Sequence, residues 1–410
     1  MSYYYKYSQQ KLFAERTSVE SLAKKNTTPF YLYSGSQIRE NYLNFVKNFK
    51  TVSPLICFSV KSNSNPFILK FLSKLGSGAD VVSYGELLKA LKAGIKPNKI
   101  VFSGVGKSEE ELKLAIKKQI LLINIESESE AILINKISKK MNRKTSVGLR
   151  LNPDIYVSTH KKISTGKAED KFGLSKKDLL FLCKKIVNLK NLKLNALSVH
   201  IGSQILSDNP YKKSLNVIAD IIKKTKIKFK FIDLGGGFGI TYKKKDRKIR
   251  LKKYSKLVNS FKKRFNCNII FEPGRSIIGN AGILVTKVQY IKKGGNKSFI
   301  ILNAGMNDFM RPALYDAFHD IIPITKRNKR NKGPVEFVGP VCETTCKFSR
   351  YKNYQKINEN DYVAIKNVGA YGYTLSSNYN TRPLIAEIFV IKNRYKVIRK
   401  RQSLLELIKV

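Results

Sequence analysis

The sequence predicts an α/β protein in which a (β/α)8 barrel of the TIM type is completed by an antiparallel β domain. From residue 54 onward, apolar runs of strand length alternate with amphipathic helical patterns, which is typical of parallel strands joined by helices. Eight such runs are present, and this number favours a closed barrel over an open sheet. After residue 281 the helical patterns stop, and short alternating strands between Gly, Asn and Lys turns indicate antiparallel β structure.

Each predicted barrel strand is a short run rich in Val, Ile, Leu and Phe. The eight strands are expected at residues 55–60, 79–83, 99–103, 120–125, 146–152, 194–201, 229–234 and 268–272, and helices at 86–93, 109–118, 128–140, 176–189 and 211–224. Strands are also expected at 3–6, 28–34, 282–293, 297–305, 334–341, 361–369, 383–392 and 394–398, and helices at 19–25 and 36–49. We therefore expect a barrel over residues 32–278, and a β domain formed by residues 1–31 and 279–410.

Composition supports a globular protein of a reducing compartment. At 410 residues and 42% hydrophobic content, the chain can form a barrel of about 250 residues and a smaller domain. Its start lacks the apolar segment of a signal peptide, and no apolar run is long enough to cross a bilayer. Five cysteines are few and odd in number for this length, which favours the cytoplasm.

The net charge of +49 would ordinarily suggest a nucleic-acid or membrane partner. The lysines are scattered, however, and the densest basic runs, residues 243–253 and 326–332, lie in no nucleic-acid motif. We interpret them as a solvated surface with weak, non-specific polyanion binding and no specific nucleic-acid partner. A nucleic-acid-binding protein would explain the charge but not the polar residues at the predicted strand ends.

Chemically reactive residues follow the predicted barrel strands, whereas the strand bodies are apolar. In such barrels the reactive groups gather at the C-terminal ends of the strands. The residues at those ends are Lys61, Asp80, Ser83, Ser103, Glu126, Arg150, Asn152, His200, the glycines from Gly235, Glu272 and Arg275.

Lys61 follows the buried strand LICFSV. A lysine desolvated at such a strand end has a lowered pKa and becomes a nucleophilic amine, as a Schiff-base lysine requires. A lysine whose ammonium group simply reaches solvent would give the same local pattern.

The segment DLGGGFG, residues 233–239, places three consecutive glycines after a strand. Gly235, Gly236 and Gly237 would let a phosphate approach the backbone, although a tight turn alone is about equally consistent with the pattern. His200, at another strand end, is either a packed histidine or a flat ring that stacks on an aromatic cofactor. With three histidines in the chain and no Cys/His spacing, we expect no metal site.

Glu272, in FEPGRS, needs a cationic or protonated partner if it is buried. Arg275 could be that partner, and so could a protonated pyridine nitrogen, whose pKa a carboxylate raises. A lysine for a Schiff base, glycines for a phosphate, a histidine face and a glutamate for a ring nitrogen together describe a pyridoxal 5'-phosphate site.

Eight motifs extend this pattern over nearly the whole chain. They are FSVKSN, GADVVSYGEL, VHIGSQ, DLGGGFG, EPGRS, MRPALYDAFH, GPVCET and GAYGYTLSSNYNTRP, in that order. With them the sequence resembles the fold-type III, alanine-racemase-like family of pyridoxal-phosphate decarboxylases, and within it the diaminopimelate decarboxylases.

The resemblance implies a role for individual residues. Lys61 would form the Schiff base, His200 would stack on the cofactor ring, and Glu272 would pair with its nitrogen. The remaining implied cofactor residues, mostly around the phosphate, are Ser203, Gly235, Gly236, Gly237, Gly274, Arg275 and Tyr371, and the implied substrate residues are Arg275, Arg311, Tyr315, Glu343 and Tyr371.

In this family the residues matching Cys342 and Glu343 come from the neighbouring subunit of a homodimer, with the cysteine as proton donor. The family pattern CES-x-D has an acidic residue where this chain has Cys346, which leaves the chemistry of that loop open. For Cys342 and Cys346 the plain alternative is two buried thiols on one loop.

The activity implied by the resemblance is decarboxylation of meso-2,6-diaminopimelate to L-lysine. Arg275 and Arg311 with Glu343 suit a substrate that carries an amino and a carboxyl group at its far end. The alternatives are a decarboxylase of ornithine, arginine or carboxynorspermidine, and a catalytically silent relative that regulates a true decarboxylase.

Overall fold

The computed structural model describes residues 4–157, 166, 169–243, 245–247 and 249–409. The chain forms two compact units, which are described separately below. One comprises Tyr42–Ile240 and Arg247–Ser276; the other comprises Met1–Asn41, Thr241–Asp246 and Ile277–Val410. The boundaries at residues 31/32 and 278/279 stay a prediction.

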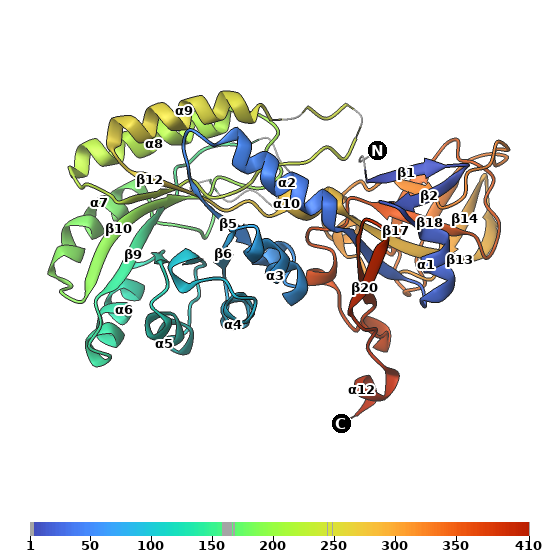
Figure 1. The fold of residues 1–410 in the computed structure, drawn as a ribbon, viewed down its shortest axis with the longest axis horizontal. Coiled ribbons are helices and arrows are strands. Elements are labelled where there is room, and N and C mark those ends of the chain that lie inside the picture. The colour runs from blue at the N-terminus through green and yellow to red at the C-terminus, as the bar shows by residue number, and fades with distance from the viewer. Residues whose placement is uncertain (1–3, 158–165, 167–168, 244, 248, 410) are drawn as a thin grey trace. The chain divides into compact units, whose positions relative to one another are not determined.

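The first unit is a closed barrel of eight parallel strands, which confirms the predicted fold class (Figure 1). The strands are β5 (Leu55–Ser59), β6 (Gly78–Val81), β7 (Ile100–Phe102), β8 (Leu122–Ile125), β9 (Thr145–Leu151), β10 (Leu192–Val199), β11 (Phe231–Asp233) and β12 (Asn268–Phe271). Closure occurs where the last strand pairs with the first, with Ile270 beside Leu55 and Phe271 beside Ile56. The ends of all eight strands lie within two residues of the predicted ends. The strands were predictable because each is a mostly apolar run.

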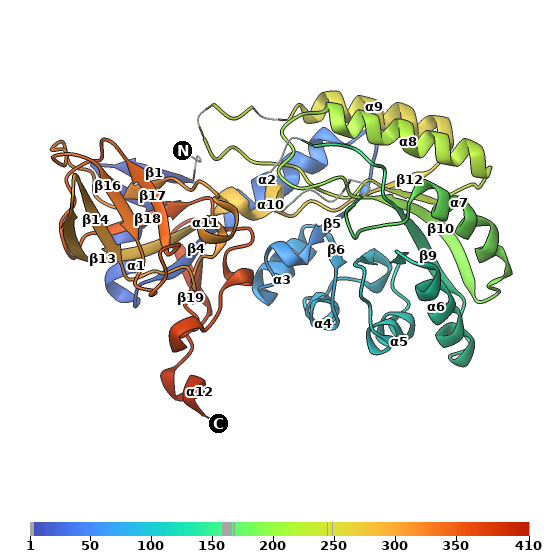
Figure 2. The same ribbon diagram turned by 180° about the vertical axis from the view of Figure 1, so that it is seen from behind.

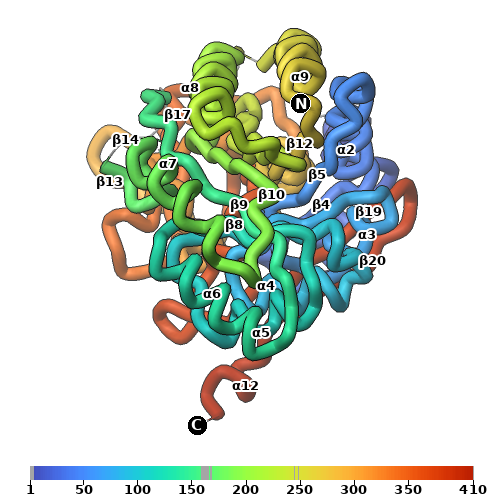
Figure 3. Tube along the Cα trace, turned by 90° about the vertical axis from the view of Figure 1, so that its left-hand side faces the viewer, coloured from blue at the N-terminus to red at the C-terminus, as the bar shows by residue number. Residues whose placement is uncertain are grey.

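Helices surround these strands, as Figure 3 shows for α4 to α9. They are α3 (Pro66–Lys74), α4 (Tyr84–Lys92), α5 (Glu109–Lys118), α6 (Glu128–Lys140), α7 (Lys176–Lys185), α8 (Asn209–Thr225) and α9 (Leu251–Phe265). Ser83, Ser108, Ser127 and Ser175 cap four of them, each accepting a hydrogen bond from the backbone N–H three residues on. Such caps satisfy donors that the first helical turn leaves unpaired, and so fix where each strand-to-helix loop ends.

Two of the helices that surround the barrel strands, α3 and α9, were missing from the sequence prediction. Residues 66–74 form α3, which begins at the Asn65 cap with Pro66 in its first turn. Residues 251–265 form α9, which packs beside α8. Its buried apolar face consists of Tyr254, Val258 and Phe261, and the lysines between them in the sequence hide this pattern.

The second unit contains a three-stranded sheet and a larger, mostly antiparallel sheet, much of which is visible in Figure 2. Its strands are β1 (Tyr5–Ser8), β2 (Lys11–Ala14), β3 (Thr17–Ser18), β4 (Phe30–Ser34), β13 (Gly282–Gly294), β14 (Lys297–Leu302), β15 (Ile321–Pro323), β16 (Val335–Val338), β17 (Lys347–Tyr351), β18 (Tyr362–Lys366), β19 (Ala386–Ile391) and β20 (Arg394–Arg399). The pairs β14/β16 and β4/β19 are parallel, so the predicted antiparallel domain is in fact mixed.

The remaining α-helices of the described residues follow in chain order. They are α1 (Val19–Lys25), α2 (Gly35–Asn48), α10 (Arg275–Ile278), α11 (Arg311–Tyr315) and α12 (Leu404–Ile408). None of the helices in the described ranges is long and apolar enough to cross a membrane.

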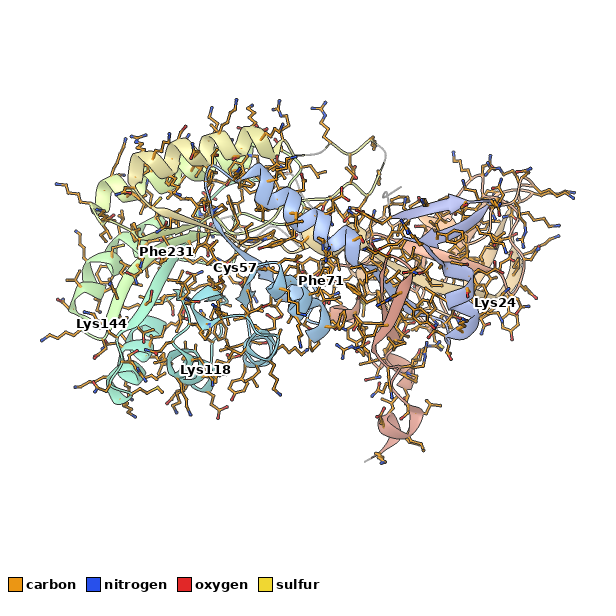
Figure 4. All side chains as sticks on the ribbon, in the orientation of Figure 1. Lys24, Cys57, Phe71, Lys118, Lys144 and Phe231 are labelled. Atoms are coloured by element: carbon orange, nitrogen blue, oxygen red, sulfur yellow. The ribbon has the colours of Figure 1, made fainter. Side chains whose placement is uncertain are left out.

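Apolar side chains fill the barrel interior away from the polar strand ends. Cys57, Val101, Leu122, Ala196 and Ile270 are fully buried there and form one cluster, with Phe231 packed against it. In Figure 4, Lys24, Lys118 and Lys144 instead point outward, and all three are exposed. The scattered basic charge is therefore a surface property at these positions, as the sequence indicated.

Candidate active site

The C-terminal strand ends of the barrel surround a cavity of about 330 Å³. Its walls include Lys61, His200 and Glu272, three of the residues selected from the sequence. The remaining lining residues are Val82, Ser103, Gly104, Val105, Asn124, Arg150, Phe172, Ser198, Val199 and Asp233. The barrel therefore brings together groups that the sequence separates widely.

Lys61 lies in a 3-10 turn, Val60–Ser62, that follows β5 directly. Its Nζ is 3.1 Å from Oδ2 of Asp80, a residue near the end of the neighbouring strand β6. The same oxygen accepts a 2.7 Å hydrogen bond from Ser59 Oγ. The Lys61 side chain is 38% exposed. The expected desolvation is thus only partial, and the lysine is oriented instead by a buried carboxylate.

Glu272 and Asp233 form a buried pair of carboxyl groups at the ends of β12 and β11. Burial, then the charges of Asp233 and Asp80, raise the pKa of Glu272 well above its ordinary value. Burial also raises the pKa of Asp233 to about 6, although hydrogen bonds from Glu272 and from the Gly235 N–H oppose that effect. The burial and the neighbouring acids therefore favour the protonated form of Glu272.

Arg275 begins α10, shortly after β12. It is buried, and its Nη2 donates a 3.0 Å hydrogen bond to Ser203 Oγ. Gly274, just before it, packs so closely on Ser62 that a Cβ would lie 2.9 Å from the serine side chain. These residues form a second polar cluster in the barrel unit, outside the lining of the cavity.

His200 is fixed by the glycine turn. Its Nδ1 accepts a 3.2 Å hydrogen bond from the Gly236 N–H, so this nitrogen carries no proton. Burial, with the charges of Lys61 and Arg150, lowers the pKa of the ring well below its ordinary value. His200 therefore presents a neutral ring to the cavity.

The three glycines fit where no side chain could. A Cβ at Gly236 would lie 2.1 Å from Glu272 O, and Gly235 and Gly237 both have positive φ. The Gly235 N–H donates to Asp233 Oδ1 at 2.9 Å. Because two of the three N–H groups bond to Asp233 and His200, the turn holds these side chains in place and is not simply an open cradle.

Other strand-end residues support the site structurally. Arg150 Nη1 pairs with Glu126 Oε1 at 2.7 Å, and both side chains are almost fully buried. Ser103 accepts a 3.1 Å hydrogen bond from Asn124 Nδ2. Ser83 caps α4, and Asn152 Oδ1 accepts the backbone N–H of Asp154, so these two act in local turns.

The remaining predicted residues belong to the second unit. Arg311 begins α11 and is buried, with its guanidinium 5.7 Å from the ring centre of Tyr315. Tyr371 adopts a φ of 55°, an uncommon conformation for a side chain of this size. Cys342 and Glu343 are exposed, and Glu343 Oε1 accepts a 2.7 Å hydrogen bond from Tyr379.

Comparison with known proteins decides between the families that share this arrangement. Residues 35–279 match the family described as the pyridoxal-binding domain of pyridoxal-dependent decarboxylases. The diaminopimelate decarboxylase of Aquifex aeolicus is 40% identical over 403 residues, which is 98% of this chain and 95% of that protein. That of Helicobacter pylori strain J99 is 44% identical over 395 residues, 95% of this chain and 96% of that protein. The chain belongs to the diaminopimelate decarboxylases.

Solved structures of diaminopimelate decarboxylases share both the fold and its extent. The H. pylori enzyme, crystallised with L-lysine, superimposes with a TM-score of 0.90 at 41% identity, covering 95% of this chain and 98% of that one. The M. jannaschii enzyme, also in complex with L-lysine, gives a TM-score of 0.93 at 33% identity over 98% and 96% of the two chains. The resemblance expected from the sequence motifs is confirmed.

Diaminopimelate decarboxylases are carboxy-lyases that use pyridoxal phosphate, and the cavity has the polar groups to bind it. Glu272 Oε1, Asn124 Oδ1 and Ser198 Oγ are buried and have no hydrogen-bond partner among the described residues, although all three side chains line the cavity. Leaving such atoms unpaired costs roughly 1–3 kcal/mol each, so they indicate a polar ligand. A pyridine ring with its nitrogen, hydroxyl and aldehyde oxygens fits this donor and acceptor set.

Sequence reasoning did not select Asp233, Asn124 or Ser198 as site residues. Asp233 stood directly before the three glycines and could have been found as one more polar strand end. Asn124 is the one polar residue of β8, LINI, and Ser198 is one of several polar residues of β10, LKLNALSV, so no local pattern marks either as a site residue.

Proposed function

We propose that the protein converts meso-2,6-diaminopimelate to L-lysine and CO2, the last step of lysine biosynthesis, with pyridoxal 5'-phosphate as cofactor. The relatives named above carry this activity in their names, and two of them have been crystallised with L-lysine. The observation that supports the proposal best is the buried Glu272 Oε1, which lacks a hydrogen-bond partner in the cavity that Lys61 and His200 also line.

Residues of the barrel unit would hold the cofactor. Lys61 would bind it covalently, the neutral His200 ring would lie against its face, and Glu272 would bind its ring nitrogen. The Ser203–Arg275 cluster, with Gly237 and Gly274 beside it, would take the phosphate, since an arginine and a hydroxyl joined by a hydrogen bond suit an anion. The motif match adds Tyr371 from the second unit.

When bound, pyridoxal phosphate supplies the electron sink that receives the electron pair released as CO2 leaves. Glu272 keeps that sink effective because its carboxyl group can hold a proton at the ring nitrogen. A neutral His200 adds no positive charge that would compete with this proton. Asp80 positions the Lys61 side chain at the strand end, where the lysine would bind the cofactor.

Substrate recognition would depend on charge. Arg275 and Arg311, with Tyr315, would bind substrate carboxylate, and Glu343 would bind the far ammonium group. A substrate with an amino-carboxyl group at each end needs both kinds of site, whereas ornithine and arginine have no distal carboxylate. This difference favours meso-diaminopimelate over those amino acids.

Cys342 would donate the proton that replaces CO2, a general-acid step worth about 10² to 10⁴ in rate. Cys342 and Glu343 are both exposed, which suits residues that complete the site of a neighbouring subunit in a homodimer. Cys346, where the family pattern has an acidic residue, is buried, and its Sγ accepts the backbone N–H of Met306 at 3.3 Å. Here the substitution fills a packed position.

We also propose that the protein works in the cytoplasm. All five cysteines are free thiols, and four of them are buried. A reducing compartment keeps cysteines as free thiols, as they are here.

A competition assay tests the function directly. The purified protein, pyridoxal phosphate and an equimolar mixture of meso-diaminopimelate, ornithine, arginine and carboxynorspermidine are incubated, and the amine products are identified by mass spectrometry. We expect lysine as the only product. Arg311→Ala should lower kcat/KM for meso-diaminopimelate by about 100-fold, because loss of a charged hydrogen bond costs roughly 1.5–3 kcal/mol. Another amine as the main product, or full activity of Arg311→Ala, would refute the substrate assignment.

A further inference from the structure

The Nε atom of the Arg311 guanidinium group is hydrogen-bonded to a histidine ring. Its Nε donates a hydrogen bond to Nε2 of His319 at 3.3 Å. Both side chains are buried, and the arginine lies over the rings of Tyr242 and Tyr315 at 5.8 and 5.7 Å. An imidazole at this place orients the guanidinium group of Arg311 without adding a negative charge beside it.

The partners of His319 determine where its proton lies. Nδ1 is 2.8 Å from the backbone carbonyl oxygen of Lys366, and a carbonyl oxygen can only accept. Nδ1 therefore carries the proton, and Nε2 has the lone pair that accepts the Arg311 N–H. A doubly protonated His319 would place two N–H donors and two positive charges against each other, so the arrangement requires the neutral ring.

The imidazole ring is held on several sides. Phe309 and Tyr242 contact it edge to face, with ring centres 4.6 and 5.0 Å away. Lys366 is the last residue of β18, which pairs with β13 and β15 in the large sheet. Ser349 Oγ bonds to the carbonyl oxygen of His319 at 2.8 Å, which fixes the backbone independently of the ring. Through the ring, Arg311 is fastened to a rigid strand.

We propose that His319 is a positioning residue that sets the selectivity for the distal carboxylate of the substrate. With Nε held by His319, the two Nη groups of Arg311 can bind a carboxylate with two parallel hydrogen bonds. Because the arginine is oriented before the substrate binds, less conformational freedom is lost on binding. This inference rests on the proposed function, and specifically on Arg311 binding a substrate carboxylate.

Two substitutions separate the hydrogen bonds of the ring. His319→Asn can still donate to Lys366 O from the position of Nδ1 but reaches too short to accept from Arg311. His319→Gln can place its carbonyl oxygen near the position of Nε2 and accept from Arg311. Ser349→Ala is the matched control, because it removes a buried hydrogen bond of His319 and leaves the ring unchanged.

The first readout is the affinity of the loaded enzyme for L-lysine divided by its affinity for cadaverine, which lacks the carboxylate. Calorimetric titration measures both. His319→Asn should lower this ratio by about 10- to 100-fold, as expected for loss of a hydrogen bond to a charged group, and His319→Gln should restore most of it. Ser349→Ala should lower the melting temperature without changing the ratio. In steady-state assays, the loss in His319→Asn should fall on KM for meso-diaminopimelate more than on kcat.

Equal losses in His319→Asn and His319→Gln, or a ratio that His319→Asn leaves unchanged, would overturn the inference while the activity itself stands. A wild-type protein that forms no lysine would overturn the proposed function and this inference together. If His319→Asn does not fold, nitrogen NMR of the wild-type enzyme gives the answer, since the chain has three histidines to assign. A proton on Nδ1 of His319 supports the inference, and a proton on Nε2 contradicts it.

Discussion

Buried carboxyl groups dominate the chemistry of the barrel site at the scale of single residues. Asp80, Asp233 and Glu272 are all buried at the strand ends, and Lys61 forms an ion pair with Asp80. Such a group of acids cannot all be ionised in a medium of low polarity. The raised pKa of Glu272 therefore favours its protonated form, next to the place where a ring nitrogen would bind.

The raised pKa of Glu272 makes the stability of the cofactor-free protein depend on pH. Glu272 has a raised pKa in the folded protein, so folding retains a proton that the unfolded chain releases above pH 4.5. Below that pH, the raised pKa of Glu272 does not change the stability. Above it, the raised pKa lowers the free energy of unfolding increasingly as the pH rises through the folded pKa. Glu272→Gln removes the effect. The substitution should therefore raise the free energy of unfolding at about pH 8, and should raise it less at about pH 4.5.

Urea titrations of the cofactor-free protein at about pH 4.5 and about pH 8 measure this difference. Glu40→Gln, on the exposed face of α2, is the control and should change stability little at either pH. If the stabilisation by Glu272→Gln is the same at both pH values, Glu272 does not hold the proton.

Elements whose sequence pattern is local were predictable. The eight strands were found because each is a separate apolar run, and α5 and α6 match their predicted ranges because Ser108 and Ser127 mark their starts. In α9, the lysines obscured an amphipathic period that becomes evident only when its buried face is seen. The proposed role of His319 depends on its contacts with Lys366 and Tyr242, which are far away in the sequence, so no local pattern could have revealed it.

The glycine turn after β11 is packed so closely that a side chain at Gly236 should destabilise the protein. Gly236→Ala would put a Cβ 2.1 Å from a backbone oxygen, which must shift, and should lower the free energy of unfolding by about 3 kcal/mol or more. Gly85 in α4 is the matched control, because a Cβ there meets nothing within 4 Å. Gly85→Ala should be neutral or stabilise by about 0.5–1 kcal/mol. Chemical denaturation of both variants checks this, and similar stability of the two would show that the turn is not closely packed.

At the scale of the whole molecule, the functional residues that the motif resemblance implies occur in each of the two compact units, and the homodimer is a proposal. The sequence could suggest a dimer only through its family resemblance, because exposure of Cys342 and Glu343 is a property of the folded chain. The net charge of +49, by contrast, was readable at once and describes the surface more than the site.

A mixing experiment tests the shared site. Lys61→Ala and Cys342→Ala should each be nearly inactive alone. If active sites combine Lys61 of one subunit with Cys342 of the other, unfolding and refolding an equal mixture should restore roughly a quarter of wild-type activity, since half of the dimers then carry one intact site. No recovery, with dimers confirmed by light scattering, would place both residues in the same subunit's site.

The central claim is that the strand-end cavity of the barrel binds pyridoxal phosphate through Lys61. The most direct measurement is to load the protein with pyridoxal phosphate, reduce it with borohydride and map the modified peptide by mass spectrometry. We expect one pyridoxyl group, on Lys61, although lysines are scattered along the whole chain. Glu272→Gln should retain this label, because it leaves the lysine in place. A label on another lysine, or spread over many, would contradict the assignment of the site.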